Sequence, residues 1–306
     1  MKKIIKIFLI IILFSIIFYS RTIEPDRLVI KQQRIYVPNW NKKLDGLKIA
    51  LISDIHAYYG KISPEKLDII INKTNEQSPD LIFILGDLDT LYLKKSLQYQ
   101  EKVGNSLQKL KAQDGVIAIL GNHDYEPEAI IKNIYKNAGI PLLENNHKYI
   151  NHNGQRLRIT GLKDLWQCKT SEDTIKNLLE NSNISTIVLS HNPDVFPNIP
   201  QNVSLTVSGH THGGEVYLPI LGAPMVPSDY HQRFRKGYII ENNKHLFVTS
   251  GIGTLSGFRF LNPPEIVILE IYSQTPQTKT TDTKHLKGFH KNYIPLYVKI
   301  KKQLKH

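Results

Sequence analysis

Five short polar clusters, each placed directly after an apolar run of β-strand character, constrain the fold of this 306-residue chain more than any other feature. The clusters are residues 54–56 (Asp-Ile-His), 86–87 (Gly-Asp), 121–124 (Gly-Asn-His-Asp), 190–192 (Ser-His-Asn) and 209–212 (Gly-His-Thr-His). In open α/β sheets, ligands bind outside the carboxyl ends of the strands. Five polar strand ends therefore predict one shared binding site.

The clusters supply carboxylate, amide and imidazole groups but no thiolate, a mixture that suits Mn²⁺, iron or Zn²⁺ in a reactive site rather than a structural zinc. Asp54 and His56 are two positions apart, so in an extended segment their side chains point to the same side. The candidate metal ligands are Asp54, His56, Asp87, Asn122, His191, His210 and His212. This set exceeds one tetrahedral site and suits two ions bridged by a carboxylate. Two ions ~3.5–4 Å apart can activate a hydroxide for attack at phosphorus.

Each cluster taken alone has an ordinary structural explanation. An Asp-x-His triplet occurs in loops by chance, Asp87 can cap a turn, and His191 can be a hydrogen-bonded core histidine. The joint occurrence favours a metal site, because five of the twelve histidines fall within the clusters.

Apolar patterning predicts alternating strands and helices in the first half of the chain. An edge strand is expected over residues 28–37, and buried strands over 47–53, 80–85 and 116–120. One helix should start with Ser63 as its N-cap and Pro64 at its first position, and further helices are expected over 93–111 and 126–137. This alternation predicts an α/β sheet.

The second half is richer in strands, with one expected helix over residues 171–181. The expected strands cover residues 148–150, 156–160, 186–190, 203–208, 238–240, 246–249 and 265–272. Many strands with few helices predict a second sheet packed on the first.

The N-terminus predicts a membrane anchor. Residues 4–20, with Lys6 extending its amine toward the interface, give roughly 17 residues or about 26 Å of helix. This is just short of a ~30 Å hydrocarbon core and is tolerated with local thinning. A cleaved signal peptide is the rival interpretation, but Phe18 stands where a small residue is needed before the cut. The lysines before the span favour a catalytic domain outside the cytoplasm, although Arg21 and Arg27 after it weaken the asymmetry.

The chain divides into an anchor (residues 1–21), a linker with an edge strand (22–45), a main domain (46–272) and a linker with a basic tail (273–306). The formal charge of +12 suits an anionic partner such as phosphate, nucleic acid or acidic lipid, or serves solubility alone. The lysines and aromatic residues of the tail suit either contact with anionic lipid or a solvated segment. The lone Cys168 excludes an internal disulfide and favours a packing role.

The ordered series Asp-x-His, Gly-Asp, Gly-Asn-His-Asp, His and Gly-His-Thr-His resembles the calcineurin-like metallophosphoesterases over residues 36–272. Four further segments are similar to the bacterial membrane-tethered branch of that family: residues 44–49, 209–219, 250–254 and 259–266. The resemblance implies the α/β class, as a four-layer α/β/β/α metallophosphoesterase sandwich carrying an N-terminal membrane helix. Two departures from the family pattern are the position of Asp89 and the insertion of Tyr58 and Tyr59 before Gly60.

The resemblance also implies roles for the site residues. Asp54, His56, Asp87 and His212 would bind one divalent ion, and Asp87, Asn122, His191 and His210 the other, with Asp87 as the bridge. His123 would lie beside the scissile phosphate as proton donor or charge stabiliser. Asp124 would orient His123.

The expected function is hydrolysis of a phosphate monoester, diester or pyrophosphate by a hydroxide that two Mn, Fe or Zn ions activate. The anchor suggests a lipid-linked substrate and single-pass attachment to the inner membrane of a bacterial cell. A catalytically silent scaffold of the same fold is one alternative, and a nuclease using the same site is another. The single span argues against the nuclease, so no nucleic-acid partner is expected.

Overall fold

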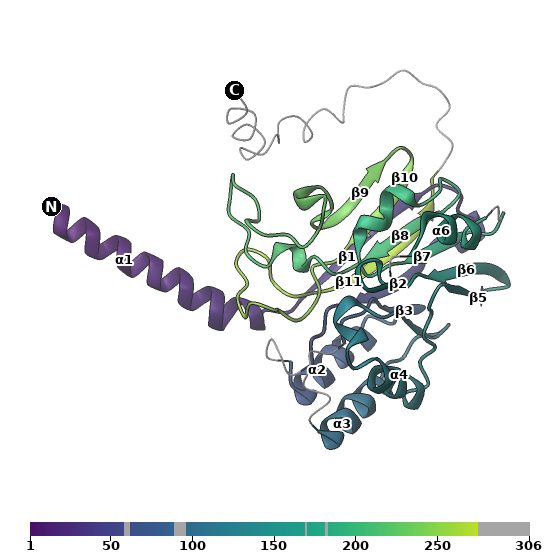
Figure 1. The fold of residues 1–306 in the computed structure, drawn as a ribbon, viewed down its shortest axis with the longest axis horizontal. Coiled ribbons are helices and arrows are strands. Elements are labelled where there is room, and N and C mark those ends of the chain that lie inside the picture. Colours follow the sequence, from purple (N-terminus) through teal and green to yellow (C-terminus); the bar gives the residue numbers. More distant parts are fainter. Residues whose placement is uncertain (58–61, 89–95, 169, 181–182, 275–306) are drawn as a thin grey trace. The chain divides into compact units, whose positions relative to one another are not determined.

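The structure is a computed structural model that describes residues 1–57, 62–88, 96–168, 170–180 and 183–274. Tyr58 and Tyr59, the displaced Asp89 and the basic tail beyond residue 274 lie outside the described residues. Figure 1 shows the arrangement of the strands and helices in the described part of the chain.

The first sheet has five strands in the order β1-β11-β2-β3-β4. Strands β2 (Leu47–Ile52), β3 (Leu81–Ile84) and β4 (Val116–Ala118) run parallel to one another and come from the predicted apolar runs. β1 (Val29–Val37) forms the edge, as predicted, and pairs in parallel with β11 (Glu265–Ser273). β11 is antiparallel to β2, so the last strand of the described chain lies between the first two.

Three helices cover one face of this sheet: α2 (Pro64–Asn75), α3 (Leu97–Leu107) and α4 (Glu128–Asn137). The predicted start of α2 is confirmed, because the Ser63 side chain accepts a hydrogen bond from the Lys66 N–H and Pro64 occupies the first turn. The helix α4 begins later than residue 126, since residues 122–125 form a separate 3₁₀ turn that carries the Gly-Asn-His-Asp cluster.

The second sheet has six strands in the order β5-β6-β7-β8-β10-β9. Its members are β5 (Asn146–His152), β6 (Gln155–Gly161), β7 (Thr186–Leu189), β8 (Leu205–Ser208), β9 (Gly237–Glu241) and β10 (Lys244–Val248). The four central strands β6, β7, β8 and β10 are parallel, and β5 and β9 pair antiparallel at the two edges. The short helices of this half are α5 (Leu165–Cys168) and α6 (Glu172–Leu178).

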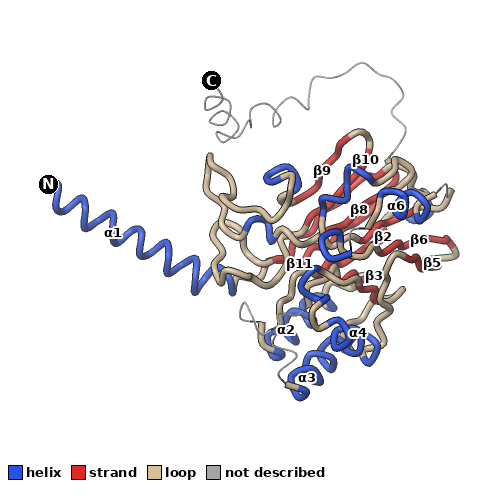
Figure 2. Tube along the Cα trace, viewed as in Figure 1, coloured by secondary structure: helices blue, strands red, loops and turns tan. Residues whose placement is uncertain are grey.

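Three apolar clusters separate four layers. One cluster lies between the sheets and joins residues such as Ile49 and Phe83 of the first sheet to Ile187 and Val207 of the second. A second cluster fills the space between the first sheet and α2, α3 and α4. The third packs α6 and two 3₁₀ turns, Pro193–Asn198 and His231–Phe234, on the outer face of the second sheet. The predicted four-layer α/β/β/α sandwich is confirmed (Figure 2).

The N-terminal helix α1 (Lys2–Phe18) has no buried residue and is followed by a π-helical turn, Tyr19–Ile23, and a 3₁₀ turn, Glu24–Asp26. Residues Lys2–Asp26 form one helix that is long and apolar enough to cross a membrane, since it contains an 18-residue window with a mean hydropathy of 2.3. Where this helix meets the main domain, Ser20, Glu24 and Pro25 are buried.

Candidate metal centre

The carboxyl ends of five strands deliver the predicted ligands to one place. Strands β2, β3 and β4 of the first sheet and β7 and β8 of the second are each followed directly by one polar cluster. Six of the seven predicted ligands are at most 4% exposed, and Asn122 is partly buried. Buried groups of this polarity require partners or a cation.

One group of side chains consists of Asp54, His56 and His212, whose potential ligand atoms all lie within 4.8 Å of one another. The Nε2 atoms of His56 and His212 face each other at 3.1 Å, and His212 Nε2 lies 3.5 Å from Asp54 Oδ1. Two imidazole nitrogens at this distance can share at most one proton, so the arrangement suits ligands that converge on a cation.

A second group surrounds His191. Its Nε2 atom lies 3.2 Å from Asp87 Oδ2, 3.2 Å from Asn122 Oδ1 and 3.3 Å from His210 Nδ1. His191 Nδ1 lies 2.7 Å from the Leu85 carbonyl oxygen and donates to it, which leaves Nε2 free to act as a ligand. The structure thus brings Asp87, Asn122, His191 and His210 together.

Asp87 lies between the two groups. Its Oδ2 atom is 3.2 Å from His191 Nε2 and 3.6 Å from His56 Nε2. Asp54 also approaches both groups, since it forms a second cluster with Asp87 and His191. Two carboxylates, each within 4.8 Å of imidazole nitrogens of both groups, supply the negative charge that a cation site needs.

The electrostatics of the centre also fit a cation. Burial lowers the pKa of His56 to about 4 and that of His210 to about 3, despite the nearby carboxylates, so both rings are neutral as metal ligands must be. Burial alone would raise the pKa of Asp87, but the facing His191 outweighs it and holds the carboxyl pKa well below its ordinary value. Burial likewise opposes the charge on His191, yet Asp87 raises its pKa to about 10. A proton on His191 therefore balances the negative charge of Asp87. A bound cation can replace that proton and balance the same charge.

Five of the ligands have a left-handed backbone, which side chains other than glycine seldom adopt. The φ angles are 52° at Asp54, 45° at His56, 53° at Asp87, 67° at His210 and 49° at His212. Each such residue costs of order 1–3 kcal/mol, and strain of this kind collects at functional sites. The surrounding packing holds all five side chains in directions that a relaxed loop would not give.

Glycines allow the ligand loops to approach each other closely. A Cβ atom at Gly209 would lie 1.9 Å from Ser53 Oγ and 2.5 Å from Asp54 Oδ2. A Cβ atom at Gly121 would lie 2.2 Å from Asp87 Oδ1. Neither glycine has a positive φ, so sterics rather than backbone conformation require glycine here.

Gly209→Ala is therefore expected to destabilise the protein by about 1–3 kcal/mol and to weaken metal binding, because Asp54 must move to admit the methyl group. Gly104→Ala is the matched control, since the nearest atom to its Cβ would be Ile134 Cγ2 at 3.9 Å and it lies inside α3. The control should be neutral or slightly stabilising. Urea unfolding and metal titration of both variants measure the two effects. Equal behaviour of the two variants would show that the loops do not need this close approach.

The Asp124 carboxylate accepts hydrogen bonds from the backbone of two neighbouring loops. Its Oδ2 atom accepts from the N–H groups of Asp87 and Gly121, both at 2.8 Å, and its Oδ1 accepts from Leu88 N–H at 2.9 Å. His123 is partly exposed, its N–H donates to Asp87 Oδ1 at 2.9 Å, and its ring lies edge-on to His56 with 5.3 Å between centroids. Asp124 thus ties the β3 and β4 loops together, and His123 lies at the border of the centre.

A buried polar network behind the centre was not identified as functional from the sequence. Arg259 is fully buried and donates to the carbonyl oxygens of Ser250, Gly251, Gly253 and Asn262. The loop that it holds supports Asp54, because the Gly253 N–H donates to the Asp54 carbonyl at 2.7 Å. A lone arginine near a proline pair gives no such signal in the sequence.

The network reaches His212 as well. The Asn262 side-chain amide donates to the His212 carbonyl at 2.7 Å, and Lys236 donates to Asn262 Oδ1 at 3.2 Å. Trp166 of α5 contributes a second unpredicted contact, since its half-exposed ring stands edge-on to His210 with 4.3 Å between centroids. Trp166 therefore forms part of the wall beside one candidate ligand.

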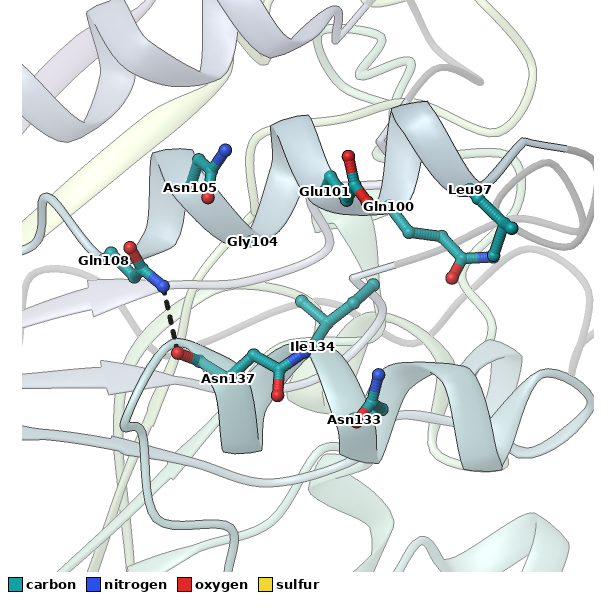
Figure 3. Close-up of a pocket in the computed structure, with 9 residues that line it drawn as sticks. All are labelled: Leu97, Gln100, Glu101, Gly104, Asn105, Gln108, Asn133, Ile134 and Asn137. Carbon is teal, nitrogen blue, oxygen red and sulfur yellow. Dashed lines mark hydrogen bonds between the residues drawn. The ribbon is translucent and has the colours of Figure 1, made fainter.

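A surface pocket lies elsewhere, between α3 and α4 (Figure 3). Gln108 bridges the two helices by donating to the Asn137 carbonyl at 2.9 Å. The lining residues are Leu97, Gln100, Glu101, Gly104, Asn105, Gln108, Asn133, Ile134 and Asn137. None of the Asp and His side chains of the metal centre lines this pocket, so it is separate from the proposed chemistry.

Comparisons with known proteins identify the family to which this chain belongs. The family model for calcineurin-like phosphoesterases matches residues 47–214. The uncharacterized metallophosphoesterase YkuE of Bacillus subtilis is 30% identical over 83% of this chain and 89% of that protein. The phosphodiesterase YaeI of Escherichia coli is 32% identical over 73% of this chain and 82% of that protein. A solved structure, the calcineurin-like phosphoesterase YfkN of Bacillus subtilis, superposes with a TM-score of 0.43 at 18% identity, covering 68% of this chain and 82% of that one. Clustered aspartates and histidines that could hold a metal, together with the match over more than half of its length, show that this chain belongs to the calcineurin-like phosphoesterase family.

Proposed function

We propose that this protein is a membrane-anchored phosphoesterase that uses two divalent cations. The observation that carries the proposal is the position of Asp87, whose carboxylate oxygen lies 3.6 Å from His56 Nε2 and 3.2 Å from His191 Nε2. A carboxylate placed between two sets of imidazoles suits a bridge between two ions. When bound, such ions activate a hydroxide and stabilise charge on the phosphoryl oxygens.

The ligands divide as the family resemblance implies. Asp54, His56, Asp87 and His212 are assigned to one ion, and Asp87, Asn122, His191 and His210 to the other. Mn, Fe and Zn all suit this mixture of carboxylate, amide and imidazole ligands. The strained backbone at five of these residues supports a preformed site, since the protein places the ligands before any ion binds.

His123 is assigned to the substrate side of the centre. Its backbone N–H is fixed by Asp87, while its ring is partly exposed and stands next to the His56 ring. From there the imidazole can donate a proton to the leaving oxygen or stabilise charge on the phosphoryl group. Asp124 acts on the loop beneath it, because its carboxylate accepts three backbone N–H groups.

The proposed substrate is an anionic phosphoester, with a diester favoured and a lipid-linked one suggested by the anchor. The Escherichia coli relative YaeI is named as a phosphodiesterase. The net charge of +12 supports attraction of an anion. The apolar helix Lys2–Asp26 supports attachment to a membrane, and the lysines before it favour a catalytic domain outside the cytoplasm.

His123→Ala is expected to keep the metal content of the wild type and to lower turnover by about 10²–10⁴-fold, the usual contribution of a general acid. The assay is hydrolysis of bis(p-nitrophenyl) phosphate and p-nitrophenyl phosphate by the full chain in detergent, with Mn²⁺ supplied and with EDTA as the metal-free arm. Metal analysis of the same samples provides the control.

Three outcomes would contradict the proposal. Turnover that persists in EDTA would exclude a metal-dependent reaction. Bound metal without hydrolysis of either ester, or of a lipid diester, would favour the catalytically silent scaffold, and hydrolysis of DNA in preference to both esters would favour the nuclease.

A further inference from the structure

An exposed apolar hairpin follows the Gly-His-Thr-His cluster. Its two sides meet where Leu218 and Gly222 exchange backbone hydrogen bonds, both of 2.9 Å. At and beyond its tip, Ile220 is 86% exposed, Leu221 71% and Met225 79%. We call residues 217–225 the apolar hairpin.

Among the described residues, Leu221 and Met225 keep most of their side-chain surface exposed. Large apolar side chains gathered on one surface segment mark a contact with another molecule or with a membrane. Ile220 also has a φ of 74°, and a left-handed conformation is a true outlier for a β-branched residue. Strained backbone conformations collect at functional sites, so a strained tip with exposed apolar side chains indicates a functional role for the hairpin.

The hairpin is attached to the segment that receives the end of α1. Val216 pairs with Phe260 in an isolated bridge, and the Tyr217 N–H donates to the Phe260 carbonyl at 2.8 Å. In turn, the Arg259 N–H donates to the Ser20 carbonyl at 2.9 Å, directly after α1.

Aromatic and basic groups accumulate at the same junction. The rings of Tyr19 and Phe260 meet edge to face with 6.4 Å between centroids, and the Arg21 guanidinium lies over the Phe258 ring at 4.8 Å. Leu261, next to this pair, is 51% exposed. Aromatic rings and arginines are typical of the level at which a spanning helix meets lipid headgroups. In Figure 1 the loops that precede β9 and β11 lie on the side of the domain where α1 joins it.

We infer that the apolar hairpin inserts into the lipid bilayer surface beside the anchor and holds the metal centre against it. This inference rests on the proposed membrane anchoring, because a spanning α1 places everything that contacts Tyr19 and Ser20 at the headgroup level. A bilayer is favoured over a protein partner, since the base of the hairpin pairs with Phe260, whose ring contacts Tyr19 directly after the apolar helix α1. Leu221 and Met225 would enter the boundary between headgroups and acyl chains.

The position of the apolar hairpin also restricts the class of substrate that can reach the metal centre. The hairpin begins five residues after His212, a candidate metal ligand, so an inserted hairpin brings the centre to the membrane surface. A phosphoester carried by a lipid headgroup would reach the centre without leaving the bilayer. The substrate class is therefore a phosphodiester or pyrophosphate whose leaving or retained group is a membrane lipid.

Fluorescence quenching in nanodiscs tests the insertion without requiring activity. The full chain with Cys168→Ser receives one cysteine at a time, Leu221→Cys or Met225→Cys, labelled with an environment-sensitive dye. Ile69→Cys on α2 is the control, since Ile69 is also apolar and 54% exposed. Lipids with a nitroxide near the headgroup should quench the labels at 221 and 225 at least about threefold more than the label at 69, and iodide should do the reverse. Equal accessibility of all three labels to iodide would overturn the inference.

A kinetic test separates this inference from the proposed function. For the double variant Leu221→Glu with Met225→Glu, the ratio of turnover on a phosphodiester in anionic vesicles to turnover on a water-soluble diester should fall about tenfold. An unchanged ratio together with unquenched labels would refute the hairpin contact while the phosphoesterase stands. Quenched labels in a protein without any phosphoesterase activity would retain the contact and refute the proposed function.

Discussion

Replacing Asp87 by asparagine is expected to remove metal binding and to lower turnover by ~10³-fold or more, because one neutral amide cannot replace a carboxylate shared by two cations. Asp87 Oδ2 is the atom that approaches both His56 and His191, and its Oδ1 accepts the His123 N–H at 2.9 Å. Asparagine keeps the size of the side chain, so the loss should come from charge rather than packing.

Two measurements separate loss of the site from loss of the fold. Metal content after dialysis should fall to background, while the circular dichroism spectrum of the metal-free protein should match that of the metal-free wild type. Asp173→Asn is the control, because Asp173 is exposed in the first turn of α6. An Asp87→Asn protein with wild-type metal content and turnover would remove the basis for the two-ion centre.

The second large effect is expected at Glu24, at the end of the N-terminal helix. Glu24 is 1% exposed, and its carboxylate accepts the backbone N–H groups of Leu261 at 2.9 Å and of Asn262 at 2.6 Å. The negative charge of Glu24 also offsets the positive charge of the buried Arg259. Burial disfavours that positive charge and lowers the pKa of Arg259. Glu24→Ala leaves one buried and one partly buried N–H donor without partners. It also leaves a buried cation with less compensation, so it should cost roughly 3 kcal/mol of stability.

The effect should extend to the metal centre. Asn262 donates to the His212 carbonyl, and Arg259 holds the loop that supports Asp54. We therefore expect Glu24→Ala to weaken metal binding about 10–100-fold, as is usual when groups that orient metal ligands are lost.

Asp26→Ala is the matched control, since Asp26 lies in the same 3₁₀ turn, is half exposed and pairs with Lys66 at 2.7 Å. A surface ion pair of this kind contributes less than about 1 kcal/mol. Urea unfolding in detergent and Mn²⁺ titration should separate the two variants. If Glu24→Ala matches Asp26→Ala in both, the helix end does not support the centre.

Sequence reasoning identified the elements that depend on local patterning. The runs that became β2, β3 and β4 are almost wholly apolar, and their polar ends locate Asp54, Asp87 and Asn122. The helix α2 follows the same local patterning, because Leu67, Ile70, Ile71 and Thr74 recur at helical spacing and are all buried. The candidate metal ligands could be selected because their residue types and spacing are those that metal coordination favours.

Non-local pairing could not be predicted in the same way. Strand β11 looks like any buried strand, and nothing local shows that it lies between β1 and β2 in the first sheet. Glu24 contacts Asn262, which lies more than 200 positions further along the chain. Arg259 contacts the Ser250 carbonyl, which only the folded loop brings close to it. Asp124 was expected to orient His123, and its backbone partners become visible only when the β3 and β4 loops are placed side by side.

The most direct test of the two-ion centre is an anomalous difference map from a crystal of this protein soaked in Mn²⁺. We expect two peaks ~3.5–4 Å apart, with Asp87 touching both. One should contact Asp54, His56 and His212, and the other Asn122, His191 and His210. A single peak away from Asp87, or none among these side chains at saturating Mn²⁺, would contradict the two-ion centre.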